Sequence, residues 1–379
     1  MLGCSTRMLV GILVVVLALF LVGLVGGAIG SSLFGIEAPS FMKFPEPHVS
    51  LPAEAVFELF GFPITNTIIA SWFTIIVVVA IFYAATRKMR FIPGRLQGLV
   101  EAGVELLLNF VEGVAGKENG RRFFPVIATI FLFVIFNAYL ALLPLFGPGI
   151  VRTEQAEAKA PVAGIVASVE VEEGDRVEEG EVIYLLDSGE EITAPIDGKA
   201  EHLLSAGDSF AANDAVASIE NHWPLFRSAN TDLNMPLAFA LMSFVFVEYW
   251  GMRVLGATRY LSTVFFNFGL LLQSLKQLLK GRVRASLGGL MTGAINGFVG
   301  ILELFSHLVR IISFTFRLFG NMTAGEILIL IAAFLVPWVM PVPFYGLEIL
   351  VGFVQALIFA GLTLVFATVA VTPHGEEEA

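Results

Sequence analysis

The chain has 379 residues, of which 56% are hydrophobic and only 15% are charged, and its formal net charge is −11. The mean hydropathy of +0.83 is far above that of a soluble domain, so the composition predicts a protein that crosses a membrane several times. The single cysteine, Cys4, excludes a disulfide framework or a thiolate metal cluster within one chain.

The first apolar run covers about residues 8–30 and follows Arg7. A spanning helix needs about 20 apolar residues, so this run predicts a signal anchor with the N-terminus inside the cell. A cleaved signal peptide is the alternative, because a basic start, an apolar run and the small residues 26–28 also fit that pattern. Both interpretations stay open for this segment.

Five further apolar segments predict membrane helices, which makes about six in all: 66–86, 122–146, 235–256, 285–338 and 342–371. Lys and Arg are concentrated after 66–86 and after 235–256, so these loops are expected to be cytoplasmic. Residues 31–65 and 147–234 then lie outside, and the tail at 373–379 returns to the cytoplasm.

Residues 96–115 place Glu101, Glu105 and Glu112 among apolar side chains at helical spacing. This pattern predicts an amphipathic helix at the cytoplasmic surface of the membrane. A helix that covers other helices of the protein is an equally good interpretation, and the two are compatible.

Residues 151–222 carry 17 acidic and four basic side chains, a net charge of −13, whereas the rest of the chain has a net charge of +2. Short alternating β runs separated by Gly, Asp and Asn predict a small all-β domain here. The stretch also repeats itself, because Gly174-Asp175 in APVAGIVASVEVEEGDRVEEGEVIYLL matches Gly207-Asp208 in APIDGKAEHLLSAGDSFAANDAVASIE. Its acidity argues against nucleic acid or anionic lipid as a partner.

The repeat resembles the biotinyl/lipoyl-type barrel-sandwich fold, in which two β half-motifs are related by a pseudo-two-fold axis. A carrier domain of that kind needs a lysine at the hairpin tip between the halves, but the tip reads Asp187-Ser188-Gly189-Glu190. We therefore expect no attached biotin or lipoate, and the sequence indicates no other cofactor and no metal. Three roles stay open for the domain: shaping the entrance of a membrane pathway, contacting a neighbouring subunit, or enriching protons through its negative field.

A stripe of polar side chains follows one face of the segment 303–321 if it forms a helix with about 100° per residue. The stripe consists of Glu303, Ser306, Arg310, Ser313, Arg317 and Asn321. At 1.5 Å per residue it is about 27 Å long, which is close to the hydrocarbon thickness of a bilayer. Placing Arg in mid-membrane costs about 2.5–3.5 kcal/mol, and a row of six polar groups indicates an aqueous pathway rather than a single structural ion pair.

The last apolar segment supplies matching groups. Glu348 and Gln355 are seven residues apart on one helix face, and Glu326 lies toward the outer side, whereas Glu303 lies toward the cytoplasmic side. Arg317 lies between these carboxylates as a charge that cannot be neutralised, and it would favour the ionised form of a passing carboxylic acid. No membrane Asp or Glu of this chain is placed to approach Arg317 and leave, so that acid is expected from another subunit.

Three runs of sequence carry a family resemblance. FRLFGNMTAGE (316–326) resembles the signature of the F-type ATP synthase subunit a, FVQALIFAGLT (353–363) resembles that family's last helix, and NTDLNMPLAFAL (230–241) resembles its TADxNxTLALAL segment. The resemblance covers about 60–146 and 224–371. It implies a non-catalytic proton-channel subunit in the membrane sector of a rotary ATP synthase, with the c-ring and the stator subunit b as partners.

The resemblance also implies roles position by position. Arg317 would be the essential arginine that faces the carboxylate of the rotating c-ring. The outer half-channel would be lined by Asn321, Glu326, Glu348 and Gln355, the cytoplasmic half-channel would include Glu303 and Ser313, and Asp232 and Asn234 would lie near the outer entrance. The last two helices would form a long, tilted hairpin beside the ring.

These features together predict an all-α polytopic membrane protein with an inserted small all-β barrel-sandwich domain. The expected domains are an N-terminal anchor or signal peptide with an outer segment (1–58), a first membrane region (59–150), the inserted domain on the outer, periplasmic side (151–222) and the channel region (223–379). The expected location is the bacterial inner membrane. The proton is the default ion, because the c-ring largely decides between proton and sodium in this family.

Two other functional classes fit the sequence less well. An envelope transport adaptor, suggested by the barrel-sandwich domain, usually has one membrane anchor and long external helical hairpins, which this sequence does not predict. A free-standing enzyme would need a phosphate-binding loop, a metal-ligand cluster or a supported Ser-His-Asp arrangement. His307 is isolated in the sequence and is not spaced as a metal ligand.

Overall fold

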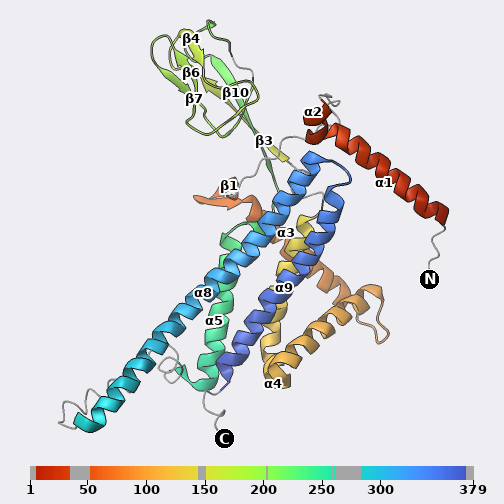
Figure 1. Ribbon diagram of the computed structural model, residues 1–379, viewed down its shortest axis with the longest axis vertical. Coiled ribbons are helices and arrows are strands. Elements are labelled where there is room, and N and C mark those ends of the chain that lie inside the picture. Colours follow the sequence, from red (N-terminus) through yellow and green to blue (C-terminus); the bar gives the residue numbers. More distant parts are fainter. Residues whose placement is uncertain are drawn as a thin grey trace. The chain divides into compact units, whose positions relative to one another are not determined.

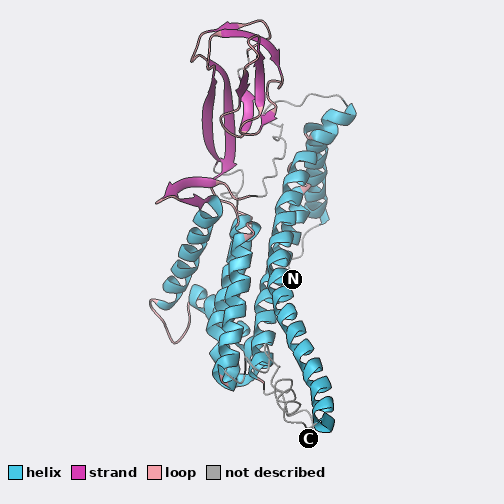
Figure 2. Ribbon diagram, turned by 90° about the vertical axis from the view of Figure 1, so that its left-hand side faces the viewer, coloured by secondary structure: helices cyan, strands magenta, loops and turns pink. Residues whose placement is uncertain are grey.

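A computed structural model describes residues 6–34, 52–143, 151–201, 204–257, 260 and 283–372. The chain divides into two compact units, and each is described by itself. The first comprises Met1–Ala53, Thr67–Leu142 and Ser228–Ala379, and the second comprises Glu54–Asn66 and Leu143–Arg227. The helices belong to the first unit, and the strands of the described residues belong to the second (Figure 2).

The helical unit contains eight helices in its described part (Figure 1): α1 (Thr6–Gly26), α2 (Ala28–Phe34), α3 (Asn66–Thr86), α4 (Arg95–Ala141), the short 3-10 helix η2 (Ala229–Thr231), α5 (Asn234–Leu255), α8 (Val283–Leu335) and α9 (Pro341–Val371). Five of them, α3, α4, α5, α8 and α9, are long and apolar enough to cross a membrane. The prediction of a multi-pass membrane protein is confirmed at this level.

The predicted N-terminal span at 8–30 falls on α1, whose apolar part Val10–Gly26 is shorter than the five membrane helices. A sixth crossing therefore stays a prediction. Of the predicted loops, residues 35–51 and 261–282 lie outside the described residues, as does the tail at 373–379.

Helix α4 consists of two arms that meet at Gly116. The φ angle of Gly116 is +75°, in the left-handed region that glycine adopts without a steric penalty. Beyond the bend, a Cβ on Gly120 would lie 3.0 Å from the Cα of Glu112, and Arg121 forms an ion pair with Glu112 at 2.9 Å. The first arm is the predicted amphipathic segment. Its Val111 and Ala115 belong to the helical core, and Leu107 is buried as well. That arm therefore covers other helices, and its contact with a membrane surface stays a prediction.

The core of the helical unit lies where α4, α5, α8 and α9 meet. Phe123 of α4 is fully buried against Trp250 of α5, with ring centroids 4.4 Å apart. Small residues let the backbones of α4 and α9 approach closely, because a Cβ on Gly352 would lie only 2.9 Å from the Cβ of Ala138. Such small-residue contacts are typical of helix packing in membranes.

The second unit contains a hairpin and two four-stranded antiparallel sheets, with strand orders β3-β10-β8-β5 and β7-β6-β4-β9. The hairpin is β1 (Ala55–Leu59) and β2 (Phe62–Thr65), and the sheet strands are β3 (Val151–Lys159), β4 (Gly164–Val169), β5 (Arg176–Val177), β6 (Val182–Leu186), β7 (Glu191–Thr193), β8 (Gly198–Glu201), β9 (Ser209–Phe210) and β10 (Ala215–Pro224). The sheets enclose one apolar core. The predicted small all-β region is present, and its likeness to the barrel-sandwich fold stays a prediction.

The core of this unit contains one fully buried tyrosine with a satisfied hydroxyl. Tyr184 donates to the carbonyl of Val216 at 2.9 Å and accepts from the backbone N–H of Leu204 at 2.7 Å. Burial raises the pKa of Tyr184 above its ordinary value, so the phenol stays a neutral donor. The hydroxyl therefore ties β6 to two other segments of the unit.

The internal repeat predicted from the sequence forms matching turns. Gly174 and Gly207 have φ angles of +95° and +97°, and their N–H groups donate to the carbonyls of Ala200 at 2.8 Å and Val166 at 2.9 Å. In both turns the aspartate after the glycine accepts a backbone N–H from three residues earlier, at 3.2 and 2.9 Å. The two halves thus use the same turn chemistry, which is why Gly-Asp recurs in the sequence.

The contact at Gly352 generates a testable prediction about stability. Replacing Gly352 by Leu should lower the free energy of unfolding by about 1–3 kcal/mol, because a side chain would push α9 away from α4. Gly346→Leu on the same helix is the matched control, since a Cβ there meets nothing within 4 Å. Thermal unfolding of the purified protein in detergent measures both, and equal melting temperatures for the two variants would contradict the packing described here.

Candidate functional site

Helices α8 and α9 lie side by side and run in opposite directions (Figure 1). Four pairs of contacting residues define their register, and the residue numbers rise along α9 as they fall along α8. From one end of the pair to the other, these contacts are Gly325 with Glu348, Asn321 with Gln355, Phe314 with Phe359, and Arg310 with Phe366. The polar stripe of α8 is therefore placed beside the polar residues of α9.

Arg317 is half-buried near the middle of this helix pair. Its Nη2 donates to the Oγ of Ser313, one turn earlier on α8, at 3.3 Å. Among the described residues, no Asp or Glu forms an ion pair with the guanidinium. Because a guanidinium stays protonated in proteins, Arg317 is a fixed positive charge that the described part of the chain leaves without a carboxylate.

One turn beyond Arg317, Asn321 connects α8 to α9. Its Nδ2 donates to the Oε1 of Gln355 at 3.0 Å, and the Gln355 side chain is only 2% exposed. The Nε2 of Gln355 is buried and has no hydrogen-bond partner within the described residues. An unsatisfied amide donor in such a place is costly, so it is a group that a water molecule or a partner side chain would stabilise.

Two carboxylates follow at the next turns of the pair. The carboxylate of Glu348 lies directly on Gly325, so that any Cβ at position 325 would overlap it. Glu348 is 8% exposed, and the half-buried Glu326 is close enough for the two carboxylates to repel each other. This end of the stripe therefore brings two carboxyl groups together.

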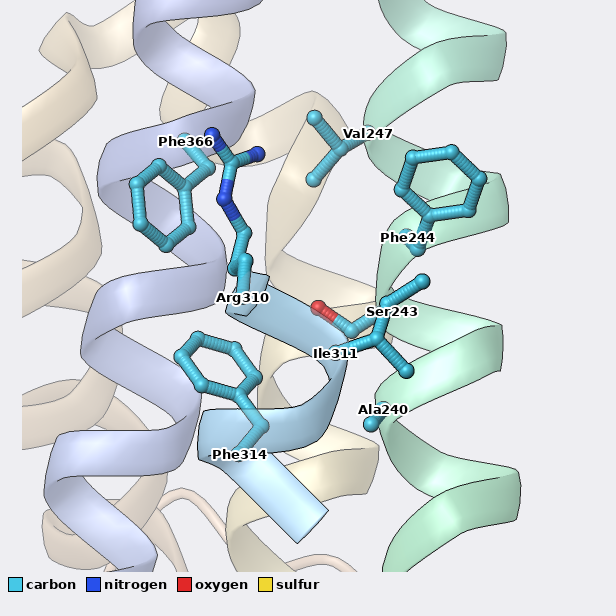
Figure 3. Close-up of a pocket in the computed structure, with 8 residues that line it drawn as sticks. All are labelled: Ala240, Ser243, Phe244, Val247, Arg310, Ile311, Phe314 and Phe366. Carbon is cyan, nitrogen blue, oxygen red and sulfur yellow. The ribbon is translucent and has the colours of Figure 1, made fainter. Parts of the chain in front are cut away.

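A small pocket lies beyond Arg317 in the other direction, between α5, α8 and α9 (Figure 3). Arg310 lines it with its Cζ 3.5 Å from the ring centroid of Phe366, a cation–π contact. On the α5 side, Ser243 lines the pocket and its Oγ is 2.7 Å from the Oγ1 of Thr363. The pocket thus combines one guanidinium, a hydroxyl and aromatic walls.

A chain of three ionisable side chains lies on the same side of Arg317 as this pocket. The Nδ1 of His307 is 3.3 Å from the Oε1 of Glu248 in α5, and its Nε2 is 3.5 Å from the Oε1 of Glu303 in α8. The side chains of His307 and Glu248 are 6% and 9% exposed, whereas that of Glu303 is 47% exposed. The exposed fraction of these side chains therefore falls from Glu303 to His307 and Glu248.

The two residues predicted near an outer entrance lie where η2 meets α5. Asp232 is buried, and its Oδ2 accepts from the Oγ1 of Thr67 in α3 at 2.8 Å, while its Oδ1 accepts the N–H of Asn234 at 3.0 Å. The Asn234 side chain is exposed. Asp232 therefore joins α3 to the start of α5 and satisfies a free N–H at the helix end.

The structure brings some of the predicted residues together and adds others. Ser313 with Arg317, Asn321 with Gln355, and Glu326 with Glu348 are neighbours, and Glu303 lies about two turns beyond Arg310 along α8. Sequence reasoning missed Glu248 and treated His307 as isolated. Within the described residues, no group of His, Cys, Asp or Glu is arranged to hold a metal ion.

Two comparisons relate the chain to known proteins. The family model described as ATP synthase A chain matches residues 68–368. The chain is 22% identical to the ATP synthase subunit a of Moorella thermoacetica over 84% of this chain and 96% of that protein. It is 24% identical to the ATP synthase subunit a of Gloeobacter violaceus, with 82% and 85% covered, and 23% identical to that of Helicobacter pylori strain P12, with 83% and 96% covered.

The contacts of Asp232 generate a second prediction. Asp232→Ala should lower the free energy of unfolding by about 1–3 kcal/mol, because the buried Thr67 hydroxyl and the part-buried N–H of Asn234 would lose their acceptor. Thr67→Val removes only one of the two hydrogen bonds and should cost less. Thermal unfolding in detergent checks both, and an Asp232→Ala protein as stable as the unmodified one would show that this connection is dispensable.

Proposed function

Because the chain belongs to the ATP synthase A chain family, and is thus a proton-translocating membrane-sector subunit of an ATP synthase, we propose that Arg317 separates two half-channels within it. In this proposal protons reach the rotating c-ring through one half-channel and leave through the other. Their flow turns the ring, and ring rotation drives ATP synthesis elsewhere in the complex. The chain itself guides protons and catalyses no covalent step.

The observation that carries the proposal is the state of Arg317. The guanidinium is half-buried on an apolar helix, and no ion pair with Asp or Glu is found for it in the described residues. An arginine at membrane depth costs about 2.5–3.5 kcal/mol unless a partner or water compensates it. We assign that partner to the carboxylate of a c-ring subunit, which arrives protonated, releases its proton into one half-channel, meets Arg317 as an anion and departs after taking a proton from the other half-channel. The cation would keep that carboxylate ionised while it passes.

The outer half-channel would use the groups between Arg317 and the far ends of α8 and α9. These are Asn321, Gln355, Glu326 and Glu348, with Asp232 and Asn234 near the entrance. Their order along the helix pair supports the assignment, since amides lie next to Arg317 and carboxylates lie farther away. The cytoplasmic half-channel would include Ser313 and Glu303 on the other side of Arg317. A fixed positive charge between the two sets would repel a proton that moved directly from one to the other.

The wider assignments follow from the same proposal. The subunit would lie in a bacterial inner membrane with its C-terminus in the cytoplasm, beside the c-ring and the stator subunit b. Residues 151–222 would be the inserted domain on the outer side, flanked by the membrane regions at 59–150 and 223–379, with 1–58 as the anchor and outer segment.

Arg317→Ala is the test of this proposal. ATP-driven proton pumping by membrane vesicles that carry the assembled complex should fall to background, because the charge that acts on the ring carboxylate is gone. The amount of assembled complex is measured in parallel by the content of its other subunits. Pumping at the normal rate would mean that Arg317 is structural and that the proposal is wrong.

The close contact between Glu348 and Gly325 provides a further variant with a matched control. Gly325→Val should reduce pumping by about tenfold or more, since a small displacement of a functional group has effects of that order. Gly320→Val on the same helix introduces the same side chain where a Cβ meets nothing within 4 Å. We expect the control to pump at a rate close to that of the unmodified complex. Equal rates in the two variants would remove Glu348 from the outer half-channel.

A further inference from the structure

The side chains of Glu303, His307 and Glu248 form a continuous row that connects two helices. Both ring nitrogens of His307 face a carboxylate oxygen, at 3.3 Å on the Glu248 side and 3.5 Å on the Glu303 side. Glu303 and His307 are one turn apart on α8, whereas Glu248 comes from α5, about 60 residues earlier in the chain. The row therefore exists only because α5 and α8 pack together.

Exposure decreases along the row in one direction. The Glu303 side chain is 47% exposed, whereas those of His307 and Glu248 are 6% and 9% exposed. The ring of Phe244 meets the imidazole edge-on with centroids 5.6 Å apart, which restricts the orientation of His307. The row thus begins at the exposed Glu303, continues through the imidazole of His307 and ends at the buried Glu248.

The buried end of the row lies near the pocket of Figure 3. Arg310 is one turn beyond His307 on α8 and acts electrostatically on both Glu248 and Glu303. It lines the pocket with Val247, the residue that precedes Glu248. On the other flank of Glu248, the Tyr260 ring lies against Gly251. A cation next to two carboxylates and an imidazole favours ionised carboxylates and a neutral imidazole, the form in which the row has free sites for a proton.

Histidine between two carboxylates has the chemistry of a proton shuttle. A neutral imidazole accepts a proton at one nitrogen and releases the proton from the other, so one proton moves along while the ring stays neutral overall. Chains of Asp, Glu and His inside membrane proteins are typical of proton pathways. A merely structural role would need only one of the two carboxylates, because a single acceptor satisfies the one N–H of a neutral imidazole.

We propose that His307 and Glu248 carry protons between Glu303 and the interior of the cytoplasmic half-channel, with His307 as the shuttle. This inference rests on the proposed function, and it adds two groups to the half-channel. Starting from a protonated Glu303, the proton passes to Nε2 of His307 while the proton on Nδ1 passes to the Glu248 carboxylate. The ring is then protonated on Nε2 alone, and it is reset when Glu248 has passed its proton on and tautomerisation returns the imidazole proton to Nδ1. The reverse sequence moves a proton from Glu248 to Glu303.

The test compares variants of the assembled complex in membrane vesicles. His307→Gln and Glu248→Gln keep polar side chains of similar size but transfer no proton, and each should slow ATP-driven proton pumping by at least about tenfold, the lower part of the range for lost proton transfer. The double variant should be no slower than the slower single variant, because both act in one relay. Val245→Ala, on an exposed part of α5, serves as the matched control with unchanged pumping.

A rescue experiment separates proton transfer from positioning. In His307→Ala vesicles treated with an uncoupler, ATP hydrolysis reports how fast the ring turns without a pH gradient. Added imidazole should restore at least half of the lost rate. Pyrazole has the same ring size but is not basic near neutral pH, and it should restore none. Equal effects of imidazole and pyrazole, or no rescue by either, would mean that His307 only positions its neighbours, and would overturn the relay.

Arg317→Ala, measured in the same vesicles, keeps the two proposals distinguishable. Normal pumping by His307→Gln and Glu248→Gln, with none by Arg317→Ala, would overturn the relay alone. Normal pumping by Arg317→Ala would overturn the proposed function and the relay with it. Slow pumping in the two relay variants with imidazole-specific rescue supports both.

Discussion

The permanent charge of an arginine inside an apolar helix bundle is the constraint on which the rest of the helical unit depends. Arg317 cannot be neutralised, and hydrocarbon offers it nothing to bind, so polar groups must be brought to its level from elsewhere in the chain. The antiparallel pairing of α8 and α9 achieves this, because it places Gln355 beside Asn321 and leaves the Ser313 hydroxyl for Arg317. The apolar core of α4, α5, α8 and α9 then holds that pairing in place.

Close backbone approach is the means by which these helices keep their register. Gly352 lets α4 touch α9, and Gly325 gives the Glu348 carboxylate its place against α8. Neither contact draws on hydrophobic burial alone, since lipid tails are as apolar as the side chains they replace. Packing of small residues and hydrogen bonds between helices, such as that of Ser243 with Thr363 at 2.7 Å, therefore carry much of the specificity of the bundle.

Much of this architecture could be predicted from the sequence, because hydropathy and helical periodicity are local signals. The segments 66–86, 235–256 and 342–371 agree with α3, α5 and α9 within a residue, and the stripe of α8 was evident from its spacing alone. The contact between Glu248 and His307 could not be predicted. A single acid in an apolar run forms no periodic pattern, and its partner is determined by how helices far apart in the sequence pack. The break at Gly116 agrees with the two separate segments predicted at 96–115 and 122–146, whereas the sequence did not show that the two helices follow each other directly at that glycine.

Within the described residues the guanidinium of Arg317 has no carboxylate partner, and this has a consequence for a newly synthesised subunit. If the ring supplies the missing carboxylate, a newly inserted subunit carries an uncompensated cation until the ring arrives, with a penalty of about 2.5–3.5 kcal/mol. A subunit in that state would be less stable in the bilayer, and membrane proteases would degrade it more readily. If Arg317 acts in transport as proposed, the same charge would also mark subunits without a ring for removal, and so link the survival of the chain to its assembly.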